Sequence, residues 1–236
     1  MRIFTFLLLF NVCALIWAES TPEWLIPLRE AVYEQKLNSE EVRPIYQRAR
    51  RAAHDNLSGA PLNVALSRCE YLMGRVLDYE KQNDRALTYY EEGKKFAEKA
   101  IEIRPSAEAW VMVAENLSHI IPLRNWTYTL ANGLDVEKFS KNALALNKRN
   151  AAAQIMIAAR WVYAPAMFRD LPKGIDMMQK VLTEGDLDKD DYFNVYVGIG
   201  YGNIQQKNNS QARSWLLKAL EIYPTNKYAA ELLSGL

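Results

Sequence analysis

The sequence contains few of the residue types from which covalent and metal sites are built. Its 236 residues include two cysteines, Cys13 and Cys69, and two histidines, His54 and His119. A disulfide-rich scaffold and a histidine-rich metal site are therefore excluded as explanations of this chain. A glycine-rich phosphate loop, a paired-cysteine motif and a nucleophile elbow are also missing. The sequence accordingly predicts a protein without enzymatic activity, metal or other cofactor.

The chain also lacks an excess of charge and a second long apolar run. It carries 29 basic and 28 acidic side chains, and loss of Arg2 with an N-terminal signal leaves 28 of each. A neutral chain has no general electrostatic reason to bind nucleic acid or an anionic membrane. Beyond the N-terminal signal, no apolar stretch approaches the roughly 20 residues that span a bilayer. We therefore expect no nucleic-acid partner and no transmembrane segment in the mature chain.

Residues 1–18 are typical of a secretory signal. Arg2 provides the positive start, residues 3–12 form an almost unbroken apolar run, and small or apolar residues follow. This layout predicts cleavage after Ala18 and a periplasmic or secreted location. Two alternatives stay open: the run remains uncleaved as a membrane anchor, or lipid is attached to Cys13. Cleavage leaves Cys69 as the one cysteine of the mature chain, which then has no intrachain disulfide.

A seven-residue phrase occurs twice in the chain. It reads KAIEIRP at residues 99–105 and KALEIYP at residues 218–224. Upstream of each phrase a glycine is followed 12 residues later by an alanine, and these pairs are Gly74–Ala86 and Gly200–Ala212. Glycine inside a helix costs about 1 kcal/mol relative to alanine, so we predict that a second helix packs closely at these glycines. The repetition indicates an array of one helical unit.

Apolar periodicity and capping residues predict helices along nearly the whole chain. Two helices precede the array, within residues 19–61, and the array occupies residues 62–236. A last short helix closes the array as a cap, which terminal repeat units generally require. The predicted helices are 23–36, 39–56, 62–81, one beginning at Asp84, 107–118, 135–146, 151–163, 172–182, 191–205, 210–222 and 225–233.

The last unit of the array resembles the tetratricopeptide repeat (TPR), a 34-residue helix–turn–helix unit. Asn203 departs from an expected aromatic position, and the other seven characteristic positions match. The matching residues are Tyr196, Ile199, Gly200, Ala212, Leu216, Ala219 and Pro224. The second unit opens with a typical Ala-Glu-Ala-Trp at residues 107–110. The resemblance covers roughly residues 62–236 and implies an all-α solenoid of helical hairpins that binds other molecules rather than performing chemistry.

Insertions make the repeats longer and less regular than this pattern. In the first unit Pro105 comes seven residues late, and the second unit is lengthened around Trp126. The third unit has four extra residues between Ala158 and Gly174. With elongated, irregular repeats after a secretory signal, the chain resembles the T-component family of tripartite ATP-independent periplasmic (TRAP) transporters. That resemblance implies a solute-binding protein as the partner and, as in some members, an internal apolar tunnel and self-association.

In repeats of this type, the first helix of each pair lines the concave face. The side of each first helix opposite its packing positions carries polar and aromatic residues, which suit recognition of a peptide or a helix. The candidate binding residues are Arg68, Tyr71, Arg75, Glu108, Val111, Glu115, Asn194, Val197 and Tyr201. The third unit instead presents Ala152, Ile155 and Ala159, which form either core or the floor of an apolar pocket.

Four local features have a structural explanation that we favour over a functional one. The acidic run at residues 186–191 lacks the glycine and the glutamate of a calcium-binding loop, so we expect a polar turn and helix cap. We expect Cys69 to be a buried thiol and His119 to lie at a helix end. A basic cluster on the second helix is expected to be a solvated face rather than a dock for an acidic partner. Its members are Arg43, Arg48, Arg50 and Arg51.

The sequence supports two functional hypotheses. The first is an exported, non-enzymatic scaffold that binds a partner protein or peptide, such as the solute-binding component of a transporter or another protein of the cell envelope. The second is a carrier of an apolar small molecule held within the superhelix. The residues expected to hold it are Ile155, Ala159, Trp161 and Tyr163. The sequence does not decide which partner binds or which oligomeric state the chain adopts. It also leaves open whether the chain's own segments, above all residues 116–134, cover the concave face.

Overall fold

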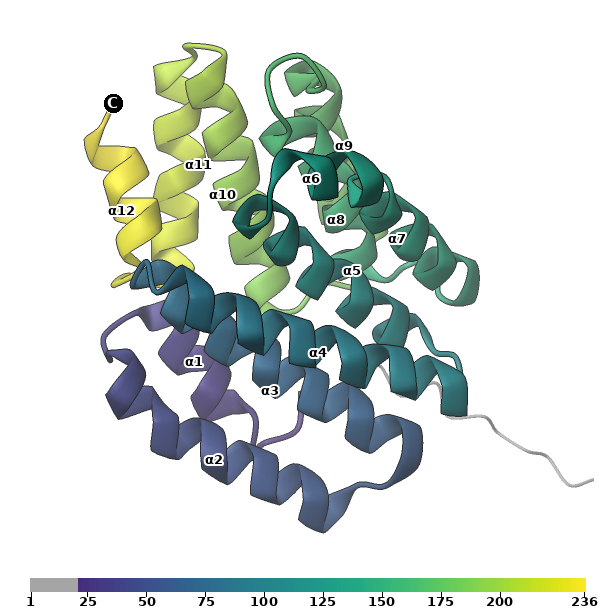
Figure 1. Cartoon of the computed structure of the whole chain (residues 1–236). Helices are drawn as coiled ribbons and strands as arrows, with labels where there is room; N and C mark the ends of the chain where they lie inside the picture. Colours follow the sequence, from purple (N-terminus) through teal and green to yellow (C-terminus); the bar gives the residue numbers. More distant parts are fainter. Residues whose placement is uncertain (1–20) are drawn as a thin grey trace, which may run out of the picture.

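The computed structural model describes residues 21–236, in which the chain forms twelve α-helices (Figure 1). The predicted signal of residues 1–18 lies outside the described residues. None of the helices in the described part of the chain is long and apolar enough to cross a membrane. The helices are α1 (Ile26–Glu34), α2 (Ser39–Asn56), α3 (Gly59–Tyr79), α4 (Asn83–Ile103), α5 (Ala107–Leu123), α6 (Trp126–Asn132), α7 (Asp135–Leu146), α8 (Ala151–Tyr163), α9 (Leu171–Glu184), α10 (Lys189–Gln205), α11 (Asn209–Ile222) and α12 (Lys227–Ser234).

Four helical hairpins stack from α3 to α11, and α12 packs on α11 at the end of the stack (Figure 1). The hairpins are α3–α4, α5–α7, α8–α9 and α10–α11, and the short α6 lies in the connection between α5 and α7. The first helices of successive hairpins also contact one another. The predicted fold class is therefore confirmed: the chain is an all-α, TPR-like solenoid of irregular hairpins with a C-terminal capping helix.

Glycines inside the first helices lie where the two helices of a hairpin approach each other closely. A Cβ atom on Gly74 of α3 would lie 2.7 Å from the Tyr90 ring of α4. A Cβ atom on Gly200 of α10 would lie 2.8 Å from the Leu216 side chain of α11. Tyr90 and Leu216 are fully buried, so neither side chain has free space to move into. The predicted close packing at these glycines is confirmed.

We expect Gly74→Ala to lower the free energy of unfolding by about 1–2 kcal/mol, because the cost of overpacking a buried ring exceeds the gain in helix propensity. Gly198→Ala is the matched control on α10. The atom nearest to its added methyl group would be the flexible end of Met178, at 3.1 Å. In urea denaturation we expect this control to be neutral or more stable. Equal effects of the two substitutions would contradict the packing explanation.

Helix α5 is longer than the sequence indicates. It continues five residues beyond the predicted end at residue 118, through His119 and Pro122. The His119 ring stacks on Tyr90 with centroids 4.8 Å apart and meets Tyr71 edge-on at 5.4 Å. This packing outweighs the loss of one backbone hydrogen bond at a proline so near the end of a helix. The prediction of His119 as a helix-end residue was therefore wrong.

Helix α2 spans the predicted residues 39–56, whereas α1 starts three residues later than predicted. The Asn38 side chain caps α2 by accepting hydrogen bonds from two N–H groups of the first turn. Helix α3 starts at Gly59, three residues earlier than predicted. The φ angle of +60° at this residue is open to glycine without strain, so the chain turns from α2 directly into α3.

Helix α2 packs on α3 through a buried polar cluster. Glu70 of α3 accepts a hydrogen bond from the Tyr46 hydroxyl at 2.8 Å and forms an ion pair with Arg50 at 3.1 Å. Arg50 is therefore not part of a purely solvated face, which corrects the expectation for one member of the basic cluster. Arg48 and Arg51 of the same cluster are exposed.

Candidate functional site

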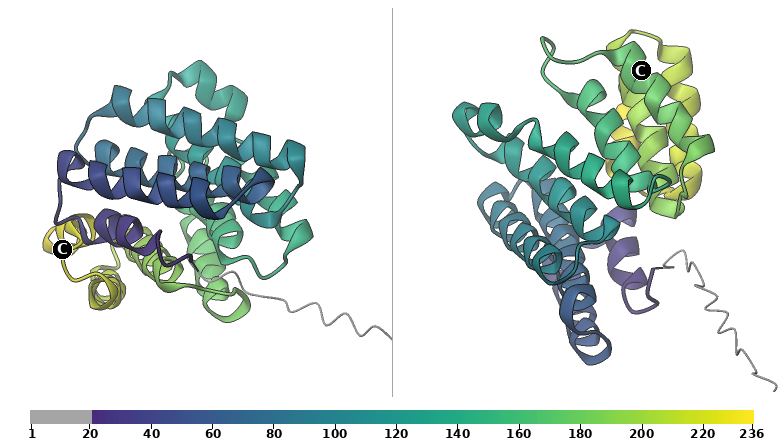
Figure 2. Two further views of the ribbon diagram at one scale, coloured as in Figure 1. Left: turned by 90° about the horizontal axis from the view of Figure 1, so that it is seen from below. Right: turned by 90° about the vertical axis from the view of Figure 1, so that its right-hand side faces the viewer.

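The concave face of the solenoid is partly filled by α1. Figure 2 shows α1 between α2 and α3 on one side and the C-terminal helices on the other. Leu28, Val32 and Tyr33 of α1 are buried in this position. A segment of the chain itself thus covers the middle of the surface on which a partner was expected to lie.

Arg29 fastens α1 to the start of α10. Its guanidinium donates to Asp190 Oδ2 and Asp188 Oδ2, each at 2.5 Å, and to the Thr21 hydroxyl. Asp190, whose side chain is 10% exposed, also accepts a hydrogen bond from the Tyr223 hydroxyl. Burial alone would raise the pKa of Asp188, but Arg29 holds that pKa below its ordinary value. This network joins α1, α10 and the residue that follows α11.

Tyr33 forms the aromatic centre of the same contact. Its ring stacks on Tyr223 with centroids 5.0 Å apart and meets Phe193 edge-on at 5.5 Å. The Arg75 guanidinium of α3 lies 4.7 Å from the centre of the Tyr33 ring, and Asn194 Nδ2 donates to the Tyr33 hydroxyl at 3.1 Å. Aromatic and cation–π contacts each add about 0.5–2 kcal/mol beyond burial. Tyr33 therefore links the first hairpin to the last.

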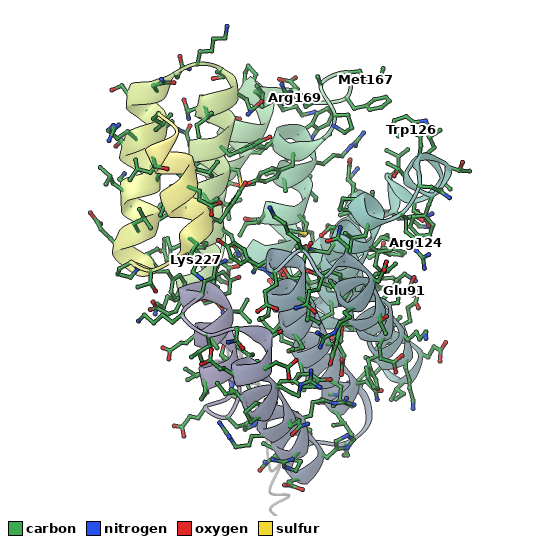
Figure 3. All side chains as sticks on the ribbon, turned by 60° about the vertical axis from the view of Figure 1, so that its left-hand side comes forward. Glu91, Arg124, Trp126, Met167, Arg169 and Lys227 are labelled. Atoms are coloured by element: carbon green, nitrogen blue, oxygen red, sulfur yellow. The ribbon has the colours of Figure 1, made fainter. Side chains whose placement is uncertain are left out.

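The C-terminal end of α1 is held by the start of α12. Asn226 Nδ2 donates to the carbonyl of Tyr33 at 2.8 Å. The Lys227 N–H donates to Gln35 Oε1 at 2.7 Å, and Figure 3 shows Lys227 at this junction. The first and last helices of the described chain thus meet, which closes the concave face on this side.

The part of the concave face that α1 leaves open is a cavity of about 900 Å³. This volume lies near the upper end of the range for ligand pockets, about 300–1,000 Å³. Residues 21–29 and the first half of α3 form one wall. The other wall consists of three connections between helices, at residues 104–108, 147–152 and 185–191. The Asp186 N–H donates to the Arg149 carbonyl at 2.7 Å, which ties two of these connections together.

The lining combines small apolar side chains with an excess of carboxylates. Its apolar members include Leu57, Ala60, Pro61, Val64, Ala151, Ala152 and Leu187. Its charged members are Glu108, Glu115, Asp186, Asp188, Asp190 and Asp191 against Arg29, Arg68 and Arg104. Within residues 21–236, neither Glu108 nor Arg104 has an ion-pair partner. The cavity therefore offers a free carboxylate in an acidic setting, beside apolar walls.

The structure brings five of the predicted binding residues together around this cavity. They are Arg68, Tyr71, Glu108, Glu115 and Asn194. Arg68 Nη1 donates to Glu115 Oε2 at 2.7 Å, so these two side chains neutralise each other across α3 and α5. Arg75 instead lines a second, smaller cavity of about 240 Å³, beside residues 35–38.

Three predicted binding residues lie away from the cavity. Val111 is buried in a core cluster between α5, α7 and α8, and Val197 is buried in the main core. Tyr201 packs against Tyr163, with ring centroids 4.9 Å apart. The prediction assumed that each first helix turns the same side to the concave face. This assumption does not hold for these positions, because each of them packs against a neighbouring helix although other residues of the same helix line the cavity.

The third unit divides between core and cavity. Ala152 lines the cavity, whereas Ile155 is buried in a core cluster and Ala159 packs against that cluster. Trp161 and Tyr163 are not among the residues that line the cavity either. The four residues expected to hold an apolar ligand are therefore not gathered around this space.

The insertion at residues 116–134 leaves the cavity uncovered. Its first part continues α5, where Asn116 Nδ2 donates to the Ser67 hydroxyl at 3.2 Å. Its second part forms α6, which lies at the far end of the molecule from α2 (Figure 1). Within the described chain, none of its residues lines the cavity. Helix α1, rather than this insertion, occupies the concave face.

The acidic run at residues 186–191 caps α10, as predicted. The Asp191 N–H donates to Asp188 Oδ1 at 2.9 Å, and the Asp188 N–H donates to Asp191 Oδ2 at 3.1 Å. Two reciprocal hydrogen bonds of this kind form a capping box. Nowhere in residues 21–236 do three His, Cys, Asp or Glu side chains gather in a group that could hold a metal ion.

Asp191 is expected to make stability depend on pH. Burial, together with the charge of Asp188, raises the pKa of Asp191 from 3.8 to about 7. The folded chain therefore keeps this proton where the unfolded chain has released it, and the free energy of unfolding falls as pH rises between these two values. Asp191→Asn removes the titration while its amide oxygen still accepts the Asp188 N–H.

We expect the free energy of unfolding of Asp191→Asn, relative to that of the wild type, to rise by about 1–2 kcal/mol as the pH rises from about 5 to about 8. Urea denaturation at each pH measures this difference. Asp55→Asn, at the exposed end of α2, is the matched control for the removal of one aspartate. An identical pH dependence in the wild type and Asp191→Asn would show that Asp191 titrates normally.

Sequence reasoning missed the residues that α1 and the acidic run contribute to the site. Arg29 and Asp190 are 161 positions apart, and no spacing rule connects them. The available signal was complementary charge: a short helix with a central arginine, and a helix start with several aspartates. That signal is too common to select this pair from the other ionic pairs of the chain.

No protein-family model matches the chain, and no curated protein matches it. Among solved structures, the chain is similar to one described as the crystal structure of YrrB, a TPR protein with an unusual peptide-binding site. The identity is 16%, the TM-score is 0.40, and the match covers 88% of this chain and 89% of that chain. A match at this TM-score transfers nothing about binding to this chain. The resemblance to the TRAP-transporter T-component family receives no support from these comparisons.

Proposed function

We propose that this protein is an exported, non-enzymatic scaffold that binds an extended segment of a partner protein in the concave cavity. The observation that carries the proposal is the cavity itself, about 900 Å³ in volume and bordered by three connections of the solenoid. Solenoids use such concave surfaces for binding across several repeats. Because α1 covers the rest of the face, the site takes a short segment rather than a whole helix.

The lining favours a basic segment with small apolar side chains. Six carboxyl groups and three guanidinium groups line the cavity, and the carboxylates stay in excess even when Asp191 is protonated. Glu108 lies in the first turn of α5 without an ion-pair partner among residues 21–236 and offers a place for a lysine or arginine of the partner. The alanines and Leu187 offer contacts to short apolar side chains. Complementary charge of this kind directs specificity and association rate.

The partner we propose is a protein of the cell envelope, such as the solute-binding component of a transporter. Export and a periplasmic or secreted location rest on the predicted signal and its cleavage after Ala18. No step of the proposed binding requires a cofactor or a metal.

Site-specific photo-crosslinking in the native cells tests this function. A photoreactive residue at Asn147, which lines the cavity and is exposed, should crosslink to one partner protein. The same residue at Arg48, exposed on α2, should not crosslink to it. A synthetic peptide of the crosslinked segment is then titrated into the purified protein by calorimetry. Crosslinking to the partner from Arg48 but not from Asn147 would contradict the proposed site.

Charge reversal gives the matched affinity test. We expect Glu108→Lys to weaken binding of that peptide about tenfold, equivalent to about 1.4 kcal/mol. Glu102→Lys changes the net charge equally, but Glu102 is exposed on α4 and lies outside the cavity. Binding of this control should change less than twofold. Equal losses in both variants would mean that only the net charge matters.

A further inference from the structure

The two insertions that lengthen the repeats carry exposed apolar side chains. Thirteen large hydrophobic residues are exposed in the described chain, and six of them fall within residues 126–134 and 163–168. These six are Trp126, Leu130, Leu134, Tyr163, Met167 and Phe168. Met167 is 76% exposed and Leu134 is 66% exposed. So dense a cluster on two short segments is unlike the single, scattered exposed hydrophobics of an ordinary surface.

Both segments lie at the same end of the molecule. Figure 1 places α6 and the connection after α8 at the top, and Figure 3 shows Trp126, Met167 and Arg169 together at that end. The ion pair between Arg160 at the end of α8 and Glu137 at the start of α7 joins the two helices next to these segments. We call the six exposed residues on these segments the apical patch.

The apical patch protrudes instead of lining a pocket. None of the seven residues of α6 is buried, although the helix includes a tryptophan, a tyrosine and a leucine. Met167 and Phe168 lie on the connection between α8 and α9, and neither lines the concave cavity. A convex tip with aromatic and long aliphatic side chains suits a deformable apolar phase better than a rigid partner, whose surface would have to be hollowed to match.

Basic side chains accompany the apical patch. Of the five lysines and arginines in residues 124–138 and 160–173, three form ion pairs with Glu91, Asp135 and Glu137. The other two, Arg169 and Lys173, have no ion-pair partner among residues 21–236. Lys173 lies over the Trp161 ring at 3.5 Å, and Arg169 hydrogen-bonds to Gln205 at 3.1 Å. Amphipathic aromatic residues with lysine and arginine beside them are typical of segments that lie in the interface of an anionic bilayer.

We propose that the apical patch inserts into the surface of an anionic lipid bilayer and holds the protein there as a peripheral protein. The tips of α6 and of the connection after α8 enter the headgroup region, and Arg169 and Lys173 face the lipid phosphates. The small net charge of the chain does not oppose this, because the attraction acts locally within about 10 Å. The concave cavity is bordered by the starts of α5, α8 and α10, whereas the apical patch follows the ends of α5 and α8, so the cavity stays accessible to a partner.

Vesicle co-sedimentation of the purified mature protein tests the proposal. The probe is vesicles of equal parts phosphatidylcholine and phosphatidylglycerol, compared with vesicles of phosphatidylcholine alone. We expect binding to the mixed vesicles, weaker binding at high salt, and weaker binding to the neutral vesicles. The triple variant Trp126→Ser, Met167→Ser and Phe168→Ser should lose at least tenfold in partition, roughly 1.4 kcal/mol.

The matched control is a triple variant that replaces three exposed hydrophobic residues outside the apical patch. Ile103→Ser, Leu146→Ser and Leu217→Ser remove residues that are 52%, 56% and 48% exposed. Its partition should change less than twofold, and thermal melting should show both triple variants folded. Equal binding by the apical variant, or no binding by the wild type, would overturn the proposal. The proposal would also be overturned if the wild type bound no vesicles but formed a dimer in ultracentrifugation that the apical variant did not form. The patch would then join two copies of the chain.

Discussion

Replacing Tyr33 by alanine is expected to lower the free energy of unfolding by about 4 kcal/mol. The ring is 4% exposed, stacks on Tyr223 and meets Phe193 edge-on. Its loss opens a cavity between α1 and α10 and removes the cation–π contact of Arg75 at 4.7 Å. Urea denaturation followed by circular dichroism measures the change.

Two further substitutions separate the causes of this loss. Tyr33→Phe keeps the ring but leaves the Asn194 amide without its acceptor, so we expect a loss of about 1 kcal/mol. Tyr192→Ala removes a tyrosine from the exposed side of α10 and should cost less than about 1 kcal/mol. If Tyr33→Ala cost no more than Tyr192→Ala, α1 would not be docked on the concave face.

Replacing Arg29 by alanine is expected to cost about 3 kcal/mol, because it leaves two carboxylates without their shared cation. Asp190 is the more sensitive of the two, since its side chain is 10% exposed, whereas that of Asp188 is 47% exposed. An unpaired buried carboxylate costs more than the lost attraction alone. The measurement is again the free energy of unfolding from urea titration.

The Arg29 prediction has a double-mutant test. Asp190→Asn in the Arg29→Ala background removes the uncompensated charge and should restore about 1 kcal/mol or more. Arg48→Ala, on the exposed side of α2, is the control and should change stability by less than about 0.5 kcal/mol. Additive effects of Arg29→Ala and Asp190→Asn would contradict a direct ionic contact.

The solenoid was predictable because its signals are local and repeated. The glycine–alanine pairs and the repeated seven-residue phrase predict a hairpin at each end of the array. The structure has the hairpins α3–α4 and α10–α11 at these two ends. The burial of Cys69 followed from its position among apolar residues, and the structure buries it fully. Periodicity reports which side of a helix faces its hairpin partner, so fold class and core could be read from it.

The concave face was less predictable because the first helices pack on neighbouring hairpins as well as on their own partners. Arg68, Glu108 and Glu115 lie around the cavity, but Val111 on the same helix as the two glutamates packs against α7 and α8. The sequence of one helix does not show which of its positions a neighbouring hairpin will cover. The docking of α1 was also hidden, because it joins residues about 160 positions apart through contacts that neither segment shows alone.

The central claim is that a partner segment binds in the concave cavity beside α1, and amide hydrogen exchange tests it most directly. Exchange is measured with and without the peptide identified by crosslinking, by mass spectrometry. We predict slower exchange in residues 104–108, 147–152 and 185–191, with residues 21–29 also protected. Protection confined to the outer side of α2 or to the apical patch, with the three connections unchanged, would contradict the claim.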